Sequence, residues 1–298
     1  MKNNLVLNPY VTVKRIGIKK VFIKVGIINE KSFVLEGNEL TEEDIELFNK
    51  LIAGKAFSVE NLKKYSEKLI EFLIEESILV NEHSLSIENY YYAINDNNFN
   101  KNSIKNKMIG FIIEDEKTKK LVDLLVDDIS VKHTFLSMED LSKIREEEYD
   151  IIICLSNYYD SLKFHEINNY LIKTNIPFMI NFIDGGNSFI SPIFIKNNTA
   201  CYNEMEIQLE ASLFYKTEYL AYKESFDNKK NDLLFLTSQI IFYALHLSID
   251  FFITNKLKTK NRVLIFNLES LRYDIVDILP LPYCLGCKRN SKMTHDFL

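Results

Sequence analysis

The sequence DIIICLSNYYDSLKFHEINNYLIKTNIPFMINFIDGGNSFISPIFIKNNTACYNEME, residues 150–206, decides the fold. It opens with an apolar run over 150–154, continues with a helical pattern over 160–174, and returns to an apolar run over 176–183. Short apolar runs that alternate with helices are typical of a parallel sheet covered on both faces. The segment therefore predicts a domain of the α/β class.

The residues on either side extend this alternation over 108–298, which we assign to one domain. Upstream, the pattern predicts a strand and then a helix, over 107–113 and 116–128. Downstream it predicts a strand, a long helix, an apolar helix and two late strands, over 188–195, 203–222, 231–254, 261–268 and 271–279.

The first 90 residues follow a different pattern. Alternating apolar residues predict three strands over 5–13, 19–28 and 32–37, and three helices follow over 41–54, 58–65 and 66–79. Thr41 and Asp44 make a capping pattern at the start of the first helix, and Gly54 ends that helix. We predict a winged-helix-like module over 1–90, followed by an Asn- and Lys-rich linker over 91–107.

The composition is that of an ordinary globular protein. The 298 residues are 47% hydrophobic and 26% charged, and a net charge of -6 argues against nucleic-acid binding. The N-terminus lacks the apolar segment of a secretory signal, so we expect a cytoplasmic protein. Gln239, His246 and Asp250 interrupt the apolar stretch 233–252, which favours a buried helix over a membrane span.

Three short motifs of the second domain carry a resemblance to a known family. They are C-x-x-N at 154–157, TACY at 199–202 and C-x-x-C at 284–287. Their order resembles the ThiF-like and ubiquitin-activating-enzyme fold, a Rossmann-type domain in which two cysteine pairs form a zinc clamp near the C-terminus. The resemblance implies a structural zinc ion held by Cys201, Glu204, Cys284 and Cys287, with Glu204 in the place of a fourth cysteine.

This ligand set leaves alternatives open. Three thiolates and a carboxylate can hold zinc, and His295 is a conceivable substitute ligand. A degenerate clamp that binds no metal is the other interpretation. Cys154 ends a buried strand, so we expect it to be a small core residue rather than a ligand.

The nucleotide site of the family is expected to be lost. The eight glycines form neither G-x-G-x-x-G nor G-x-x-x-x-G-K-[ST]. The sequence MIGFIIEDEKTKK, residues 108–120, stands where the family has its glycine-rich loop and brings carboxylates to the expected phosphate position. Ser156 stands in the place of a magnesium-binding aspartate, although Asn157 is retained. We therefore expect a degenerate ThiF-like domain without a bound nucleotide.

A small module followed by such a domain resembles the partner proteins of azole-containing bacteriocin synthetases, of the type of the B component of microcin B17 synthetase. The resemblance implies a non-catalytic subunit that binds the leader peptide of a precursor. It further implies that the subunit presents Cys, Ser and Thr residues to a YcaO-type cyclodehydratase, which forms thiazoline and oxazoline rings. A flavin dehydrogenase and a second copy of the chain are further expected partners.

Two alternatives from other classes stay open. One is a divergent ATP-dependent adenylating enzyme that acts on a peptide, and it requires a nucleotide site. The other is a winged-helix DNA regulator, which requires a basic recognition helix. The third predicted helix, 66–79, carries four glutamates and one lysine, which disfavours DNA binding.

Leader binding is expected to use strand addition, in which an extended peptide pairs with the edge of a sheet and places apolar side chains in a groove. The third strand and the third helix of the module would form this groove. The same apolar residues could instead form the core of the module. The predicted peptide-binding residues are Phe33, Val34, Leu35, Leu69, Phe72, Leu73 and Glu76.

Overall fold

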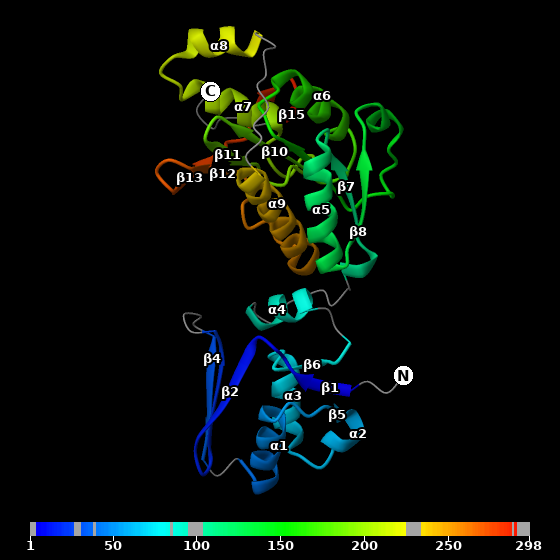
Figure 1. Cartoon of the computed structure of the whole chain (residues 1–298), viewed down its shortest axis with the longest axis vertical. Coiled ribbons are helices and arrows are strands. Elements are labelled where there is room, and N and C mark those ends of the chain that lie inside the picture. Colours follow the sequence, from blue (N-terminus) through cyan, green and yellow to red (C-terminus); the bar gives the residue numbers. More distant parts are fainter. Residues whose placement is uncertain are drawn as a thin grey trace. The chain divides into compact units, whose positions relative to one another are not determined.

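The chain folds into two compact units, Met1–Ser103 and Ile104–Leu298 (Figure 1). The computed structural model describes residues 4–26, 31–37, 40–83, 86–94, 104–224, 234–287 and 289–290. In the stretch 91–107, which was predicted to be a linker, residues 91–94 belong to a helix and 104–106 to a short 3-10 helix.

The N-terminal unit contains two three-stranded sheets. One has the order β5–β1–β6, formed by β5 (Phe57–Ser58), β1 (Asn4–Leu7) and β6 (Leu79–Asn81). The other has the order β2–β3–β4, formed by β2 (Val11–Gly17), β3 (Lys20–Val25) and β4 (Ser32–Glu36). All their pairings are antiparallel, and β4 is an edge strand among the described residues.

The single strand predicted over 5–13 is wrong, because the chain turns between β1 and β2 and passes from one sheet to the other. Pro9 has no N–H for a ladder, and the Tyr10 N–H donates to the Asn8 side chain at 3.0 Å. The buried Asn8 amide also donates to the carbonyl groups of Ser77 and Asn89, at 3.0 and 2.9 Å. The hydrogen bonds of the buried Asn8 side chain therefore hold the turn in place.

The described residues of this unit also form four helices: α1 (Glu42–Ile52), α2 (Val59–Leu62), α3 (Glu67–Glu75) and α4 (Ser86–Ile94). The predicted start of α1 is confirmed by a capping box between Thr41 and Asp44. Asp44 is fully buried, and its second oxygen accepts the Ser66 N–H at 3.1 Å just before α3. One carboxylate thus links the starts of two helices.

The C-terminal unit is built on a seven-stranded sheet of order β13–β12–β11–β10–β9–β7–β8. Strands β7 (Met108–Ile112), β8 (Lys132–Leu136), β9 (Ile151–Ser156) and β10 (Phe178–Asp184) are parallel. Strands β11 (Asn187–Ile190), β12 (Arg262–Asn267) and β13 (Arg272–Asp277) continue the sheet in antiparallel pairs. The predicted parallel, Rossmann-like core is confirmed, within a mixed sheet.

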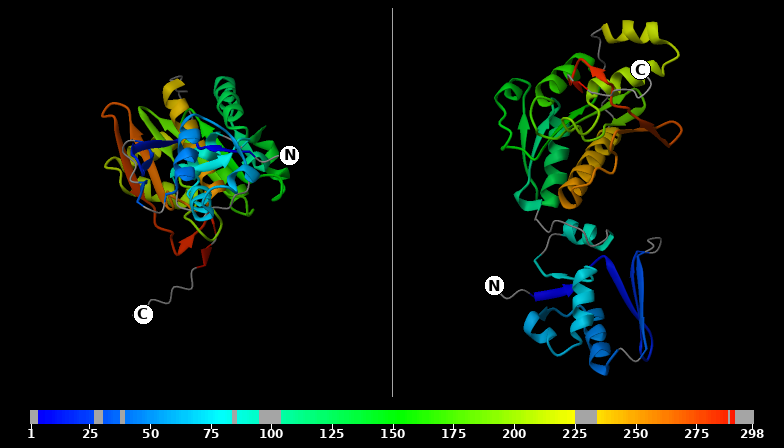
Figure 2. Two further views of the ribbon diagram at one scale, coloured as in Figure 1. Left: turned by 90° about the horizontal axis from the view of Figure 1, so that it is seen from below. Right: turned by 180° about the vertical axis from the view of Figure 1, so that it is seen from behind.

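Helices cover both faces of this sheet. Helix α9 (Leu234–Thr254) packs on β9, β10 and β11 and against α5 (Glu116–Ile129), and the two helices lie side by side in Figures 1 and 2. On the other face, α6 (Ser161–Leu171) packs against α7 (Tyr202–Ala211). The one long helix predicted over 203–222 is wrong, because the chain breaks it at Ser212–Tyr215 into α7 and α8 (Lys216–Glu224).

Helix α9 is long and apolar enough to cross a membrane by composition, but 67% of its most apolar window is buried inside the protein. Its polar residues have partners there. The Gln239 side chain accepts from the Ser188 hydroxyl at 3.1 Å, and Asp250 pairs with Lys258 at 2.6 Å. The prediction of a core helix is therefore confirmed.

Candidate functional site

The N-terminal unit carries a groove of about 540 Å³ between the edge of β4 and α3. Its volume lies within the range of about 300–1,000 Å³ that is usual for ligand sites. Among the predicted peptide-binding residues, Val34, Leu35, Leu69 and Phe72 line the groove. Val34 is 51% exposed, so its side chain is open to a ligand.

The other three predicted residues lie around the groove rather than in its lining. Phe33 packs edge-on against Phe72, with ring centroids 5.1 Å apart. Leu73 is fully buried in the core of the unit. Glu76 forms an ion pair with Lys31 at 3.3 Å, which joins the segment before β4 to the end of α3.

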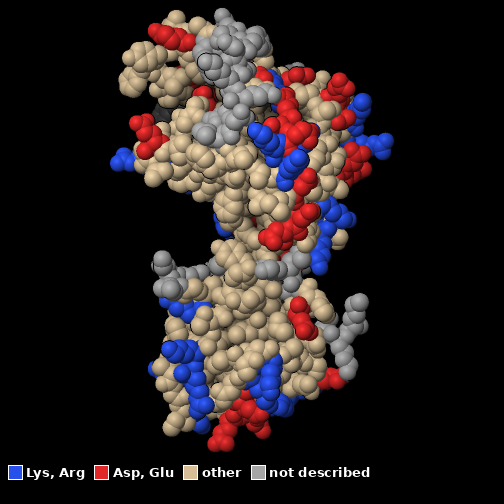
Figure 3. Space-filling model, in the orientation of Figure 1, with Lys and Arg blue, Asp and Glu red and all other residues tan. Residues whose placement is uncertain are grey.

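The free edge of β4 has the geometry that strand addition requires. Strand β4 pairs with β3 on one side, and among the described residues no strand pairs with its other side. Lys14, Arg15 and Lys20 lie on the neighbouring strands β2 and β3, and Lys20 pairs with Glu36 of β4. In Figure 3 Lys and Arg side chains gather on the lower part of this unit, beside a group of acidic side chains.

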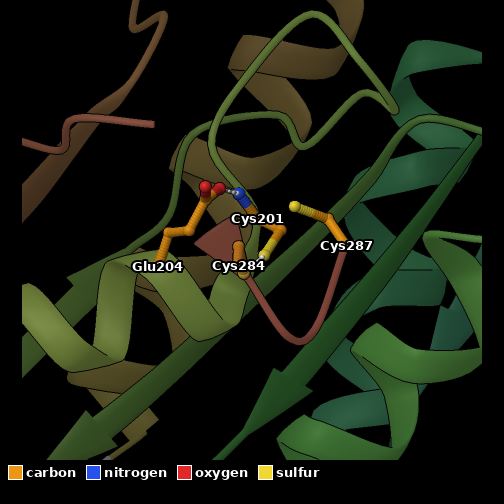
Figure 4. Close-up of side chains that lie close together, drawn as sticks. All are labelled: Cys201, Glu204, Cys284 and Cys287. Atoms are coloured by element: carbon orange, nitrogen blue, oxygen red, sulfur yellow. Dashed lines mark hydrogen bonds between the residues drawn. The ribbon is translucent and has the colours of Figure 1, made fainter. Parts of the chain in front are cut away.

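The C-terminal unit brings Cys201, Glu204, Cys284 and Cys287 together, with one ligand atom of each within 4.8 Å of the others (Figure 4). The sulfur atoms of Cys201 and Cys284 are 3.6 Å apart. Two Zn–S bonds of about 2.3 Å span at most about 4.6 Å, so both sulfurs can bind one ion without large movement. His295 lies outside the described residues.

Local structure explains how these side chains converge. Cys201 precedes α7, and Cys284 belongs to β14 (Tyr283–Cys284), which pairs with β15 (Arg289–Asn290). Gly286 lies so close to α7 that an added Cβ would stand 2.9 Å from Cβ of Asn203. A glycine in the C-x-x-C turn therefore lets the turn approach the start of α7.

Glu204 has a structural role that the sequence motif did not reveal. Its carboxylate accepts the backbone N–H groups of Cys201 and Leu281, each at 2.7 Å, and the first of these closes a capping box on α7. In Figure 4 the carboxylate points to the backbone nitrogen of Cys201. Both oxygens keep further lone pairs, so coordination of a metal remains compatible with these bonds.

The thiols of Cys201 and Cys284 have opposite pKa shifts. Burial raises the pKa of the Cys201 thiol well above its ordinary value. Burial acts in the same direction on Cys284, but hydrogen bonds from the Asn203 amide and the Cys287 backbone outweigh it and lower the pKa of that thiol. Thiolates are the zinc-binding form of cysteine, and three of them with a carboxylate suit a zinc ion.

Cys154, in contrast, is a core residue. It is fully buried within β9, and burial raises the pKa of its thiol to about 12. This prediction is confirmed.

The carboxyl ends of β7 and β9 form the topological switch point of the parallel sheet, because β8 and β9 lie on opposite sides of β7. The cavity there is only about 20 Å³, room for about one water molecule. Glu114 fills the site, since its two oxygens bind the Lys163 ammonium at 2.7 Å and the Tyr158 hydroxyl at 2.8 Å. Asp115 caps α5 by accepting the Thr118 N–H at 2.8 Å.

Ser156 and Asn157 of the C-x-x-N motif bind neighbouring groups of the protein. The Ser156 hydroxyl donates to the carbonyl of Tyr158 at 2.7 Å. The Asn157 side chain donates to Thr118 at 3.2 Å and accepts from Thr237 at 3.1 Å, which joins α5, β9 and α9. The polar groups at this end of the sheet therefore bind each other.

Comparisons of the sequence with protein-family models and with curated proteins gave no match. Solved structures share the fold. A protein described as a heterocyclase in complex with substrate and cofactor aligns with a TM-score of 0.70 and 12% identity, over 96% of this chain and 39% of that chain. The heterocyclase TruD gives 0.69 and 12% identity, over 96% of this chain and 43% of that chain. This chain thus spans about two fifths of the length of these heterocyclases.

E. coli MccB aligns with a TM-score of 0.57 and 14% identity, over 96% of this chain and 97% of that chain. The microcin C7 biosynthetic enzyme MccB in complex with N-formylated MccA gives 0.59 and 13% identity, over 95% of this chain and 99% of that chain. At such identities the likeness is one of fold. It confirms the predicted resemblance at the level of fold.

Proposed function

We propose that this protein is a non-catalytic, leader-peptide-binding scaffold subunit of a YcaO-type cyclodehydratase complex. The complex would form thiazoline and oxazoline rings from Cys, Ser and Thr residues of a ribosomally made bacteriocin precursor. The observation that carries the proposal is the groove beside the free edge of β4, with Val34, Leu35, Leu69 and Phe72 in its lining. A peptide strand could pair with that edge and place alternate side chains in the groove.

The fold comparisons support a role in peptide modification. A heterocyclase solved with its substrate and MccB solved with MccA both share this fold. The chain spans about two fifths of the length of these heterocyclases. In the proposed complex, a YcaO-type cyclodehydratase supplies the catalytic part. Tethering the leader raises the effective concentration of the core peptide at that subunit, which gives a non-catalytic partner a function.

The filled switch point supports a scaffold over an adenylating enzyme. A magnesium nucleotide would have to displace the ion pair of Glu114 and Lys163, and the Glu114 and Asp115 carboxylates would repel its phosphates. The Ser156 hydroxyl is a poor ligand for a hard cation and already donates to the protein backbone. We therefore propose that the chain does not use ATP itself.

The cysteine cluster supports a structural zinc ion as part of the same proposal. Cys201, Cys284, Cys287 and Glu204 would hold it, and the ion would join the C-terminal hairpin to the start of α7. A cytoplasmic location, self-association and contact with a flavin dehydrogenase complete the proposed setting.

The proposal is tested by titrating the full chain with labelled leader peptides from precursors encoded near its gene. We expect Val34→Asp to weaken binding about tenfold or more, because it puts a carboxylate beside the apolar side chains of Leu35, Leu69 and Phe72 in the groove. Val59→Asp is the matched control, since Val59 is 52% exposed, against 51% for Val34, and lies outside the groove.

Failure of the folded chain to bind every neighbouring precursor would contradict the proposal. Peptide-dependent cleavage of ATP to AMP by the isolated chain would instead favour the adenylating enzyme.

A further inference from the structure

The C-terminal unit contains a second cavity, of about 170 Å³, that includes none of the cysteine-cluster ligands and none of the switch-point residues. Its lining residues belong to β10, β11 and β12, to α7 and α8, and to the loops beside them. An apolar cavity of about 150 Å³ accepts a benzene molecule, so this one has room for a single side chain. It is smaller than the usual site for a drug-sized ligand.

One wall of the cavity is aromatic. The rings of Phe182 and Phe189 stack with centroids 4.7 Å apart and an interplanar angle of 9°. The Tyr219 hydroxyl donates to the Tyr159 hydroxyl at 2.7 Å, which fixes two further rings of the lining. Such a wall suits an apolar stem, and its ring faces also attract a cation.

The lining also contains three carboxylates. Asp184, Glu206 and Glu210 all belong to its lining. Lys223 pairs with Glu206 at 3.2 Å and also with Glu210, and His165 binds Glu206 at 2.6 Å. Asp184, by contrast, forms no ion pair with any of the described residues.

Asp184 is placed to receive a cation from outside. It ends β10 two residues after Phe182, so both side chains point to the same face of the sheet. Burial raises the pKa of Asp184, and no neighbouring cation opposes that shift. Lys223 shows the matching chemistry within the chain, because its ammonium lies 5.9 Å from the ring centre of Tyr219 while it pairs with Glu206 and Glu210.

We propose that this cavity binds a basic side chain, an arginine or lysine of the precursor peptide, with its cation at Asp184 and its stem against Phe182, Phe189 and Tyr219. The inference rests on the proposed function, since it gives the peptide a second anchor in the C-terminal unit. A free cationic metabolite has the same chemistry and is distinguished below.

The test uses the full chain and two probes of equal shape, N-acetyl-L-arginine N-methylamide and its uncharged citrulline analogue. We expect calorimetry or ligand-detected NMR to show the arginine probe binding about tenfold more tightly than the citrulline probe. Asp184→Asn should remove this difference. Glu218→Gln is the matched control, because it removes an exposed carboxylate of α8 outside the cavity and should leave the difference unchanged.

A second variant keeps the test valid if Asp184→Asn unfolds the chain. Ser212→Trp, at the exposed rim, should block both probes and leave the thermal unfolding temperature unchanged. Equal binding of the two probes by the wild-type chain would overturn the inference, and so would an unaltered preference in Asp184→Asn.

The source of the ligand is decided with the precursor itself. Replacing each arginine and lysine of the precursor with glutamine should weaken its binding to wild type and have no further effect in Asp184→Asn. The precursor could bind wild type and Asp184→Asn equally tightly while the arginine probe binds wild type more tightly. That pair of results would assign the cavity to a free cation and overturn the peptide assignment. If the arginine and citrulline probes bind equally but leader binding still depends on Val34, this inference fails and the proposed function is unaffected.

Discussion

Replacing Glu206 with glutamine should destabilise the C-terminal unit by about 3 kcal/mol at pH 7. The Glu206 side chain is only 6% exposed, yet five groups converge on its carboxylate. Burial alone would raise the pKa of Glu206, but the hydrogen bonds from His165, Tyr159 and Ser161 outweigh it and lower the pKa to about 2. The five partners are Tyr159, Ser161 and Tyr202 on one oxygen and His165 and Lys223 on the other.

The magnitude follows from this pKa. A fall from 4.5 in the unfolded chain to about 2 in the folded one corresponds to about 3 kcal/mol in favour of the ionised, folded state. Because the folded pKa is depressed, this stabilisation is complete above about pH 4.5 and is lost as the pH falls toward 2. At pH 3.5, one unit below the unfolded pKa, about 1.4 kcal/mol of it has gone. Glutamine cannot accept from every donor and carries no charge at any pH.

The assay is thermal unfolding of wild type and Glu206→Gln at pH 7 and pH 3.5. For a unit of this size we expect the variant to melt about 6–12 °C lower at pH 7, and the gap to narrow by about 3–5 °C at pH 3.5. Glu166→Gln is the control, because Glu166 is an exposed residue of α6 whose replacement should change stability by less than about 0.5 kcal/mol. A gap below about 1 kcal/mol at pH 7, or one that does not change with pH, would refute the reasoning.

Two further predictions concern the switch point and the cysteine cluster. Glu114→Gln removes the carboxylate partner of Lys163, whose side chain is 8% exposed, and should lower the free energy of unfolding in urea by about 1–3 kcal/mol. Glu116→Gln, at a side chain that is 75% exposed, should change the free energy of unfolding little. Equal effects of the two substitutions would show that the ion pair of Glu114 with Lys163 does not contribute more to stability than an exposed pair. Cys284→Ser should reduce the zinc content of the purified protein, measured by mass spectrometry, to background, whereas Cys154→Ala should retain it. Unchanged zinc in Cys284→Ser would exclude this ligand set.

Much of the fold could be predicted where local signals and burial agree. The apolar run that becomes β9 is buried along its whole length, and no short-range alternative competes with a central parallel strand. The start of α1 is equally local, because Thr41 and Asp44 satisfy each other within one turn. Helix α9 was identified as a core helix because its polar residues needed partners that a protein interior supplies.

The sequence-based predictions are wrong or incomplete where contacts between distant parts of the chain determine the structure. Strand β8 was missed because its five residues are mostly half-exposed at the sheet edge and carry Lys132 and His133. The break after α7 leaves Phe214 fully exposed, which no apolar periodicity would predict. The separation of β1 from β2 depends on Asn8, whose partners lie 69 and 81 residues away in the chain.

Among the candidate sites, too, some could be predicted from the sequence and others could not. The cysteine cluster was predicted from the resemblance to the ThiF-like family, which pairs the C-x-x-C motif at 284–287 with Cys201 and Glu204. The carboxylate network around Glu206 gave no such signal, since its members come from α6, α7, α8 and the loop before α6. Only the folded chain shows that Asp184 at the end of β10 lies in the lining of the same cavity.

The switch point differs from the two proposed binding surfaces in how far its polar groups are paired within the protein. At the switch point, Glu114 pairs with Lys163, and the Asn157 side chain is bonded to Thr118 and Thr237, so little bonding capacity is left for a ligand. Among the described residues, one side of β4 has no neighbouring strand, so its backbone groups can still pair with a peptide. Asp184 likewise lines its cavity without a cation as partner among these residues. This contrast agrees with the proposed function, in which the chain holds a peptide and does not activate it. If the two surfaces act together, a precursor altered at both anchors should lose more affinity than the sum of the single losses, since tethering at one site raises the effective concentration at the other. Additive losses would show that the two sites bind independently.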